Sequence, residues 1–331
     1  MLQIIIKFED GTVSMDPTRA NIERALSESG TLFWLDFLDP TPDEIALLTD
    51  PFGFHPLAIE DCISKAQRSK IERYHLTGSA NDHSYFYMVI HGLEMTSPEA
   101  EVQVVELDTF SSERYLLTLH DSPMPFVDDV FRRVRMDLPE CGIDGLLYQI
   151  LDHLVDGHLP VLERLQDEMD ILEDEAVSDP SADLLTRVAA MKRQLLQLRK
   201  LIGPQREVLA QMTRGEVPFI RETTRIYLRD VLDHLTRNLE TIELCRELII
   251  SSRDIYMSNL NNSLNQVMKA LTIITVTALP ATVITSFFGQ NFTTPLFDSI
   301  LHSNLGFWLT IATIVMLVGG LLEMFRRWKW L

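Results

Sequence analysis

Cysteine is scarce in this sequence, and the few cysteines present form no recognisable pattern. Three occur among 331 residues: Cys62, Cys141 and Cys245. They are odd in number, far apart and outside any CxxC motif, which argues against a disulfide framework and against a zinc site. We therefore expect reduced thiols in a cytosolic setting.

Basic residues are also few, which bears on the partners of the protein. Lys and Arg number 29 against 48 Asp and Glu, a formal net charge of -19. The first 264 residues hold 46 acidic and 25 basic residues, a net of -21. Nucleic acid is not an expected partner of such a surface, because phosphate contacts need basic side chains. An acidic body can instead concentrate cations, although solubility alone would explain the same excess.

Motifs for enzymatic chemistry are missing as well. The sequence contains neither GxGxxG nor the phosphate loop GxxxxGK[ST], and no nucleophile stands beside a base. An enzyme with a small-molecule cofactor is therefore not expected. The first residues, MLQIIIKFEDGT, are too short and too soon acidic for a signal peptide, so the soluble part should stay on the side of synthesis.

Residues 1–140 are typical of a small α/β domain. Runs rich in β-branched and aromatic residues, bounded by Gly, Pro, Asp and Ser, predict strands at 3–8, 31–37, 85–93, 102–110 and 115–120. The last two should form a hairpin, because only SSER separates them. Short helices are predicted at 21–29, 43–49 and 56–65.

Residues 141–214 carry apolar side chains at spacings of three and four, which predicts a helical hairpin. The first helix should run from 142 to 176, with Gly157 and Pro160 placed to bend it. The second should run from 182 to 212, after a turn at Asp179-Pro180-Ser181. Because the first helix is acidic and the second basic, the two should pack antiparallel beside the helix that follows.

Helix-breaking residues are nearly absent from the next segment. Between 219 and 288 there is no glycine and one proline, Pro280. About 70 unbroken residues at ~1.5 Å each would form a helix on the order of 105 Å long, several times the ~30 Å hydrocarbon core of a bilayer. No charged residue occurs in 270–288. We therefore predict a stalk helix and a first membrane span, at 215–266 and 267–288.

One face of this predicted helix is polar through the span. Steps of three and four residues stay on one side of a helix, and here they select Asn261, Asn265, Met268, Thr272, Thr275, Leu279, Thr282 and Ser286. The simpler interpretation of the hydroxyls alone is that they bond the preceding turn or a neighbouring helix. The two asparagines before the span and Gly289-Gln290-Asn291 after it extend the polar face, which favours an ion path. Met268 and Leu279 interrupt it and are predicted to form apolar constrictions that exclude water, with plain packing as the alternative.

A second apolar segment completes the predicted membrane module. Residues 305–325 are long enough to span a bilayer and carry Glu323 as their only charge, with 289–304 as the external loop between the spans. The basic run at 326–331, RRWKWL, predicts a cytoplasmic C-terminus, and Trp328 and Trp330 suit the membrane interface. We expect a multi-pass protein of the inner (plasma) membrane with both termini in the cytoplasm.

Two helices per chain cannot enclose a water-filled path through lipid. If the polar face lines water, several copies must surround that water. The geometry therefore predicts self-association into a symmetric homo-oligomer within the membrane lipid.

Several motifs occur in an order and spacing that resemble one known family. They are WLDFLDPTPDEI, HPLAIEDC, YLLTLHD, YLRDVLDHL, LNQVMKALTIIT, the proline at 280, the Gly-x-Asn at 289–291 and the basic C-terminus. On these grounds the chain resembles the CorA family of divalent-cation transporters, including its ZntB branch. The resemblance implies a funnel-shaped homopentamer with a cytoplasmic α/β domain, a long stalk helix continuing into a pore-lining first span, and an outer ring of second spans.

The resemblance also implies roles for single residues. Gly289, Gln290 and Asn291 match the signature loop, in which an asparagine ring receives the hydrated ion. Pore-lining positions of the family match Asn265, Met268, Leu279 and Thr282. Asp230 and Asp254 match carboxylates that bind regulatory magnesium between subunits in some members, and a solvated helix face is the alternative. Magnesium-transporting members have Gly-Met-Asn and more outer acids, whereas this chain has Gln290 and Asp298 alone.

A further group of residues could be read as metal ligands. Asp152, His153, Asp156 and His158 lie close together in the sequence. Their helical directions diverge and no thiolate accompanies them, which favours a charged surface over a metal site.

Three functions stay open on the sequence alone. The first is passive or gated transport of divalent cations, namely magnesium, cobalt, nickel or zinc, which would act as substrate and potential regulator. The second is proton-coupled zinc transport of the ZntB type, although Glu323 is the only ionisable residue in 270–288 and 305–325. The third is a membrane-anchored scaffold that senses cytosolic metal without transport, against which the retained Asn291 speaks.

Overall fold

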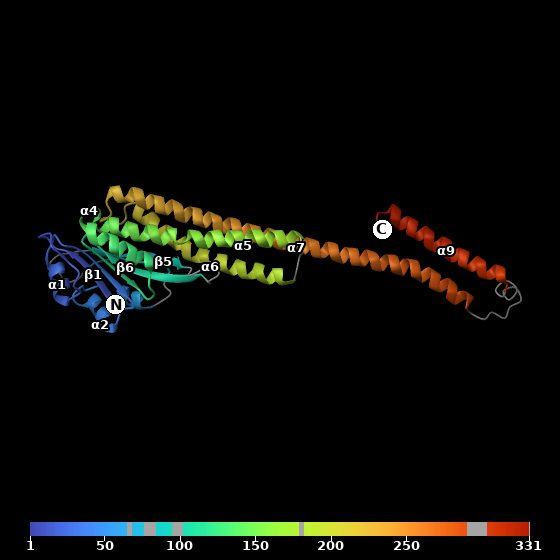
Figure 1. The fold of residues 1–331 in the computed structure, drawn as a ribbon, viewed down its shortest axis with the longest axis horizontal. Coiled ribbons are helices and arrows are strands. Elements are labelled where there is room, and N and C mark those ends of the chain that lie inside the picture. The colour runs from blue at the N-terminus through green and yellow to red at the C-terminus, as the bar shows by residue number, and fades with distance from the viewer. Residues whose placement is uncertain (65–67, 76–83, 95–101, 179–181, 290–302, 331) are drawn as a thin grey trace. The chain divides into compact units, whose positions relative to one another are not determined.

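The computed structural model of the protein describes residues 1–64, 68–75, 84–94, 102–178, 182–289 and 303–330. The chain divides into two compact units, and Figure 1 labels helices and strands along it. The first consists of Met1–Glu175 and Ser181–Ser252, and the second of Ala176–Pro180 and Arg253–Leu331.

Among the described residues, a seven-stranded sheet forms the centre of the first unit, in the order β2-β1-β3-β7-β6-β5-β4. Its strands are β1 (Leu2–Lys7), β2 (Val13–Ser14), β3 (Leu32–Leu38), β4 (Lys70–His75), β5 (Ser84–Glu94), β6 (Gln103–Ser111) and β7 (Tyr115–His120). Neighbouring strands are antiparallel except β3 and β7, which run parallel. Every residue of β7 is buried, as expected for a strand covered on both faces.

Helices cover both faces of this sheet. On one face lie α1 (Arg19–Ser27), α2 (Pro42–Thr49) and α3 (Pro56–Ile63), whose Ile22, Leu48 and Ala58 are fully buried in a core with Phe33 of β3. On the other face lies α4 (Pro125–Asp156), where the ring centroid of Phe131 is 5.0 Å from that of Trp34. Successive side chains of β3 point to opposite faces of the sheet, so this strand contributes to an apolar layer on each face.

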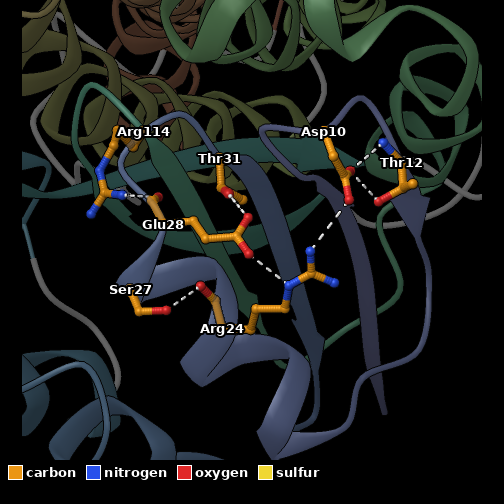
Figure 2. Close-up of polar contacts among 7 residues, drawn as sticks. All are labelled: Asp10, Thr12, Arg24, Ser27, Glu28, Thr31 and Arg114. Carbon is orange, nitrogen blue, oxygen red and sulfur yellow. Dashed lines mark hydrogen bonds and ion pairs between the residues drawn. The ribbon is translucent and has the colours of Figure 1, made fainter.

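Exposed polar contacts fix the C-terminal end of α1 against the strands (Figure 2). The guanidinium of Arg24 contacts the carboxylate of Glu28 at 2.7 Å and that of Asp10 at 3.4 Å. Arg114 donates from Nη1 to the backbone carbonyl of Glu28 at 2.6 Å. Because the two ion pairs of Arg24 lie at the surface, solvent screening keeps their contribution to stability small.

The strands predicted from the sequence are confirmed to within two residues at each end, as is the hairpin of β6 and β7. Two further strands were not predicted. β2 has two residues, too few to show a period, and β4 has the sequence KIERYH, in which charged residues interrupt the apolar ones. Both are edge strands, where one side chain row meets solvent and the apolar pattern weakens.

Long helices follow the sheet, and glycine interrupts the first of them at one place and ends it at another. The predicted second helix of the hairpin is confirmed by α6 (Ala182–Thr213). The first differs, because α4 begins at Pro125, well before the predicted start, and Gly142 at φ +67° breaks it internally. The expected bend at Gly157 and Pro160 is a full break, after which α5 runs over Leu159–Ser178.

Ion pairs join these helices to the long helix α7 (Glu222–Phe288) within the first unit. Arg187 of α6 contacts Glu175 of α5 at 2.6 Å, and Arg199 of α6 contacts Glu243 of α7 at 2.7 Å. These ion pairs match the opposite charges that the sequence predicts for neighbouring helices in this part of the chain.

A buried carboxylate fixes the start of α7. Asp144 of α4 accepts hydrogen bonds from the backbone N–H of Arg221 (3.1 Å), from its guanidinium (2.8 Å) and from the hydroxyl of Thr224 (2.5 Å). Burial alone would raise the pKa of Asp144, but these hydrogen bonds outweigh it and lower the pKa below its usual range. The interaction joins residues 77 positions apart and holds the first turn of α7 on α4.

The second unit contains the C-terminal part of α7 and α9 (Asn304–Arg327). Both helices are long and apolar enough to cross a membrane. Pro280 lies inside α7 without ending it, and its missing N–H leaves the carbonyl of Val276 without that helical partner. α9 begins at a Ser303 cap, whose hydroxyl accepts from the N–H of Gly306 at 3.1 Å.

Candidate ion pathway and membrane spans

The predicted polar face lies entirely on the helical part of α7. Its eight positions between Asn261 and Ser286 fall within an arc of about 100° when each residue advances ~100° around the axis. Thr272 is half-buried and the other seven are exposed, with 59 % of Met268 and 62 % of Leu279 accessible in the single chain. The face is therefore continuous and, within one chain, uncovered. We call it the polar stripe.

The threonine hydroxyls of the stripe donate to their own helix. Thr272 donates to the carbonyl of Met268 at 2.7 Å, and Thr275 to that of Leu271 at 2.8 Å. Thr282 donates in the same way to the carbonyl of Ala278 at 2.9 Å. Because the single proton of each hydroxyl is used, its oxygen faces outward as an acceptor.

Threonines away from the stripe make the same bond. Thr277 donates to the carbonyl of Ile273 at 2.7 Å, and Thr285 to that of Ala281 at 3.0 Å. They lie roughly 170° and 110° around the helix from the centre of the stripe. The bond itself does not distinguish an ion-lining hydroxyl from a lipid-facing one. What distinguishes the stripe is its continuation through Asn261 and Asn265.

The two apolar members of the stripe are separated along the helix. Met268 and Leu279 are eleven residues apart in α7, about 16 Å of helical rise. Thr272 and Thr275 lie between them on the same face. The stripe therefore has an apolar side chain at two heights along the helix and a polar stretch between them.

The predicted signature loop, residues 289–291, begins directly after α7. The N–H of Gly289 donates to the carbonyl of Thr285 at 2.9 Å. A Cβ at this glycine would lie 3.2 Å from the Thr285 carbonyl oxygen, closer than most side chains tolerate. Gln290 and Asn291 lie outside the described residues, so their predicted role stays a prediction.

Asp230 and Asp254 are both exposed on α7, with different neighbours. A carboxylate oxygen of Asp230 lies 3.8 Å from Nε2 of His234, whose Nδ1 lies 3.5 Å from Asp156. The carboxylate of Asp254 contacts Arg253 at 3.0 Å. The two positions are 24 residues apart in one helix, about 36 Å of rise. One chain therefore cannot bring both to a single ion, and a shared site requires different chains.

The acidic and histidine residues near the end of α4 face separate surroundings. His153 bonds the carbonyl of Gln149 (2.7 Å), and fully buried His158 lies with Nε2 3.3 Å from the carbonyl of His91. Burial lowers the pKa of His158 to about 4, so its imidazole is neutral at pH 7. Within the described ranges, no group of three or more His, Cys, Asp or Glu side chains is arranged to hold a metal ion.

An acidic cavity of about 660 Å³ in the first unit had no signal in the sequence. Asp39 and Asp121, which follow the parallel strands β3 and β7, line it together with Asp108 of β6. Burial and the charges of Glu106 and Asp121 raise the pKa of Asp108 well above its usual value, against the hydrogen bond from Tyr87. These carboxylates come from three segments with no common spacing, so only the fold brings them together.

The fold and the apolar helices define a class of protein. An α/β unit with a buried sheet, one long helix that becomes apolar, and a second apolar helix are the parts of a membrane protein with a soluble domain. Residues 29–327 match the family described as CorA-like Mg²⁺ transporter protein, and the chain belongs to this family. The family consists of transporters of the inner membrane and not of enzymes, and its substrates are divalent cations.

Individual relatives agree with this assignment. The chain is 31 % identical over 311 residues to YfjQ of Bacillus subtilis, named as a candidate metal ion transporter, with 93 % of each chain covered. It is 30 % identical over 308 residues to the cobalt/magnesium transport protein CorA of Thermotoga maritima, covering 92 % of this chain and 85 % of the relative. The resemblance to the CorA family is therefore confirmed.

A solved structure confirms the predicted fold class. The structure of the CorA magnesium transporter from Methanocaldococcus jannaschii superposes with a TM-score of 0.79 at 22 % identity, covering 99 % of this chain and 98 % of that one. At this identity the likeness concerns the fold: an α/β domain, a long helix and two apolar helices.

Proposed function

We propose that this chain assembles as a homopentamer in the inner membrane and conducts divalent cations, magnesium first among them, along the polar stripe of α7. The observation that carries the proposal is the continuity of the stripe on one exposed face of an unbroken helix. An exposed polar face at membrane depth requires water or protein opposite it. Several α7 helices around one axis would supply both.

The chemistry of the stripe fits a hydrated cation. Magnesium gives up water reluctantly and is usually bound with several waters retained. Such waters point their hydrogens outward, and they need acceptors. The hydroxyl oxygens of Thr275 and Thr282 are acceptors, because their protons are used within the helix. Neutral oxygens also hold the ion weakly enough to release it.

Met268 and Leu279 would act as gates in this arrangement. Rings of apolar side chains exclude water at a narrow point, and conduction then requires that the ring widen. The polar stretch between them would hold an ion with its waters. In the same proposal, Gly289, Gln290 and Asn291 form the entrance, with the Asn291 amides receiving the hydrated ion.

The charges flanking the two helices support a cytoplasmic location of the soluble unit. Lys269, Arg326, Arg327 and Lys329 stand at the same end of the two spans. Basic residues favour the cytoplasmic side. A membrane potential of 100 mV, negative inside, would then drive a divalent ion inward with about 4.6 kcal/mol. Asp230 and Asp254 are proposed, in this assembly, to bind regulatory cations between subunits.

Ion flux into proteoliposomes tests the proposal. We expect the wild-type chain to carry magnesium, cobalt or nickel faster than empty liposomes, and Asn291→Ala to abolish this flux without a change in oligomer size. Flux equal to that of empty liposomes for every divalent ion would contradict transport. Zinc flux that requires a pH gradient would favour proton coupling instead.

A further inference from the structure

The C-terminal end of α9 closes with a tight backbone turn. The N–H of Trp330 donates to the carbonyl of Phe325 at 3.0 Å, and that of Lys329 to the carbonyl of Arg326 at 3.1 Å. The rings of Phe325 and Trp330 stack at 5.7 Å between centroids. These two bonds and the apolar contact define a Schellman turn, the arrangement that commonly ends a helix. The segment after α9 is therefore folded back against the helix.

The residue at the critical position of this turn is unusual. Lys329 has φ +55°, in the left-handed region where glycine normally stands. A lysine there costs conformational energy that a glycine would not, and such strain points to a use for the side chain.

The basic side chains of this turn are not needed to complete the helix. Basic residues often compensate the free carbonyls at a helix end, but here backbone N–H groups already bond the carbonyls of Met324, Phe325 and Arg326. Arg327 lies 3.4 Å from the carboxylate of Glu323. Within the part of the chain that the structure describes, Arg326 and Lys329 have no ion pair. Their charges are available to another anion.

Two exposed indoles accompany these charges. Trp328 is 60 % accessible and Trp330 37 %, and their rings meet edge to face at 6.4 Å. Indole rings favour the boundary between hydrocarbon and water. The apolar part of α9 before Arg326 is about 20 residues long, which matches the ~30 Å hydrocarbon core. The turn therefore falls at the level of the lipid headgroups.

We propose that residues 326–330 form a headgroup site for anionic phospholipid of the cytoplasmic leaflet. Arg326 and Lys329 bind the phosphate, and Trp328 and Trp330 lie against the glycerol and upper acyl chain. The inference rests on the proposed membrane orientation. A lipid fits better than a soluble anion because the site lies at the end of an apolar helix, beside hydrocarbon.

Tryptophan quenching by brominated lipid measures this binding in the full-length protein. A Trp308→Phe background removes the indole near the other end of α9, and Trp34 is fully buried in the sheet. In phosphatidylcholine bilayers with equal fractions of either brominated lipid, brominated phosphatidylglycerol should quench more than brominated phosphatidylcholine. Equal quenching by the two lipids overturns the proposal.

The conformation of Lys329 supplies a variant that removes charge without harming the fold. Lys329→Gly keeps or relieves the positive-φ turn, and Arg326→Gln removes the second cation. Each change should lower the preference for phosphatidylglycerol by about fivefold, whereas Lys329→Arg should retain it. Arg132→Gln and Lys192→Gln, each made singly at an exposed cation of the first unit, make the same charge change as either variant and should have no effect. An unchanged preference in both single variants overturns the site.

Two controls separate this site from its alternatives. Excess inorganic phosphate should leave the quenching unchanged, and abolition of the preference by phosphate overturns a lipid site in favour of a free-anion site. Ion flux in the same vesicles tests transport separately. A chain that conducts ions without any lipid preference refutes this site alone, and one that prefers phosphatidylglycerol without flux refutes the proposed function alone.

Discussion

The two units of this chain differ in how far their apolar side chains are buried. In the first unit Phe33, Trp34 and Leu117 are fully buried between helices and the sheet. In the second, Val267, Leu279 and Val283 are exposed in the single chain. The first unit buries a large apolar core within one chain, whereas the apolar faces of the second need lipid or further chains to cover them. A soluble fold and a membrane assembly therefore occur in one sequence, and the same substitution should act differently in each.

The largest expected effect is on stability, in the sheet. Leu117→Ala removes a fully buried side chain from β7 and should lower the free energy of unfolding by about 2–5 kcal/mol. Leu279→Ala removes the same atoms from a position that is 62 % exposed and should leave the first unit unchanged. Denaturant unfolding followed by the fluorescence of buried Trp34 measures both. Equal destabilisation by the two would contradict the contrast between the units.

A second prediction concerns the buried carboxylate at the start of α7. Asp144→Asn weakens its bonds to Arg221 and Thr224, and should cost about 1–3 kcal/mol. Because the folded protein lowers the pKa of Asp144, this stabilisation is full above the unfolded pKa of ~3.9 and is lost as the pH falls through the folded pKa. The difference in the free energy of unfolding between wild type and variant should therefore be constant near neutrality and shrink below about pH 4. Unfolding curves at several pH values test this sign.

The third prediction compares two threonines at nearly the same depth. Thr275→Val removes a hydroxyl from the stripe and should reduce magnesium flux about 3- to 10-fold, the equivalent of one lost hydrogen bond to the ion's water. Thr277→Val removes an identical intrahelical bond on another face and should leave flux unchanged. Stopped-flow flux in proteoliposomes measures both. Equal loss in the two variants would place the stripe away from the pathway.

The smallest expected effect is at the surface of the first unit. Arg24→Ala breaks exposed ion pairs with Glu28 and Asp10 and should lower the free energy of unfolding only slightly, because solvent screens such pairs. Because dissolved salt screens exposed ion pairs, the difference in the free energy of unfolding between wild type and variant should disappear in high salt. A loss that persists in high salt would show that Arg24 contributes through its packing over the Phe8 ring instead.

The sequence predicted those elements whose residues repeat with one period. The apolar runs of β5 and β7 and the long glycine-free stretch of α7 identify their elements because burial or helical period is uniform along each. The charged edge strand β4 lacks this uniformity. The helical segment before Gly142 was missed although its buried residues repeat at helical spacing: Val127, Val130, Phe131 and Val134. The predicted start at Gly142 coincides with the break between the two helical segments of α4.

The residue spacing of the candidate site could be predicted from the sequence, whereas the contacts between distant segments could not. A spacing of three and four residues is enough to find the stripe, because every member belongs to one helix. Contacts between distant segments leave no such signal. The bond from Thr224 to Asp144 joins residues 80 positions apart, and the Gln205 bond to the His91 carbonyl spans 114. Pathway residues can be proposed from one chain, whereas the packing that positions them needs the fold.

Pro280 has a mechanical consequence for α7. The backbone between Val276 and Pro280 lacks one hydrogen bond of the helix, so the span can bend there. In the proposed assembly, a bend at this point would move Thr282 and Ser286 relative to the pore axis while Met268 stays in place. The outer half of the stripe would then widen independently of the proposed constriction at Met268.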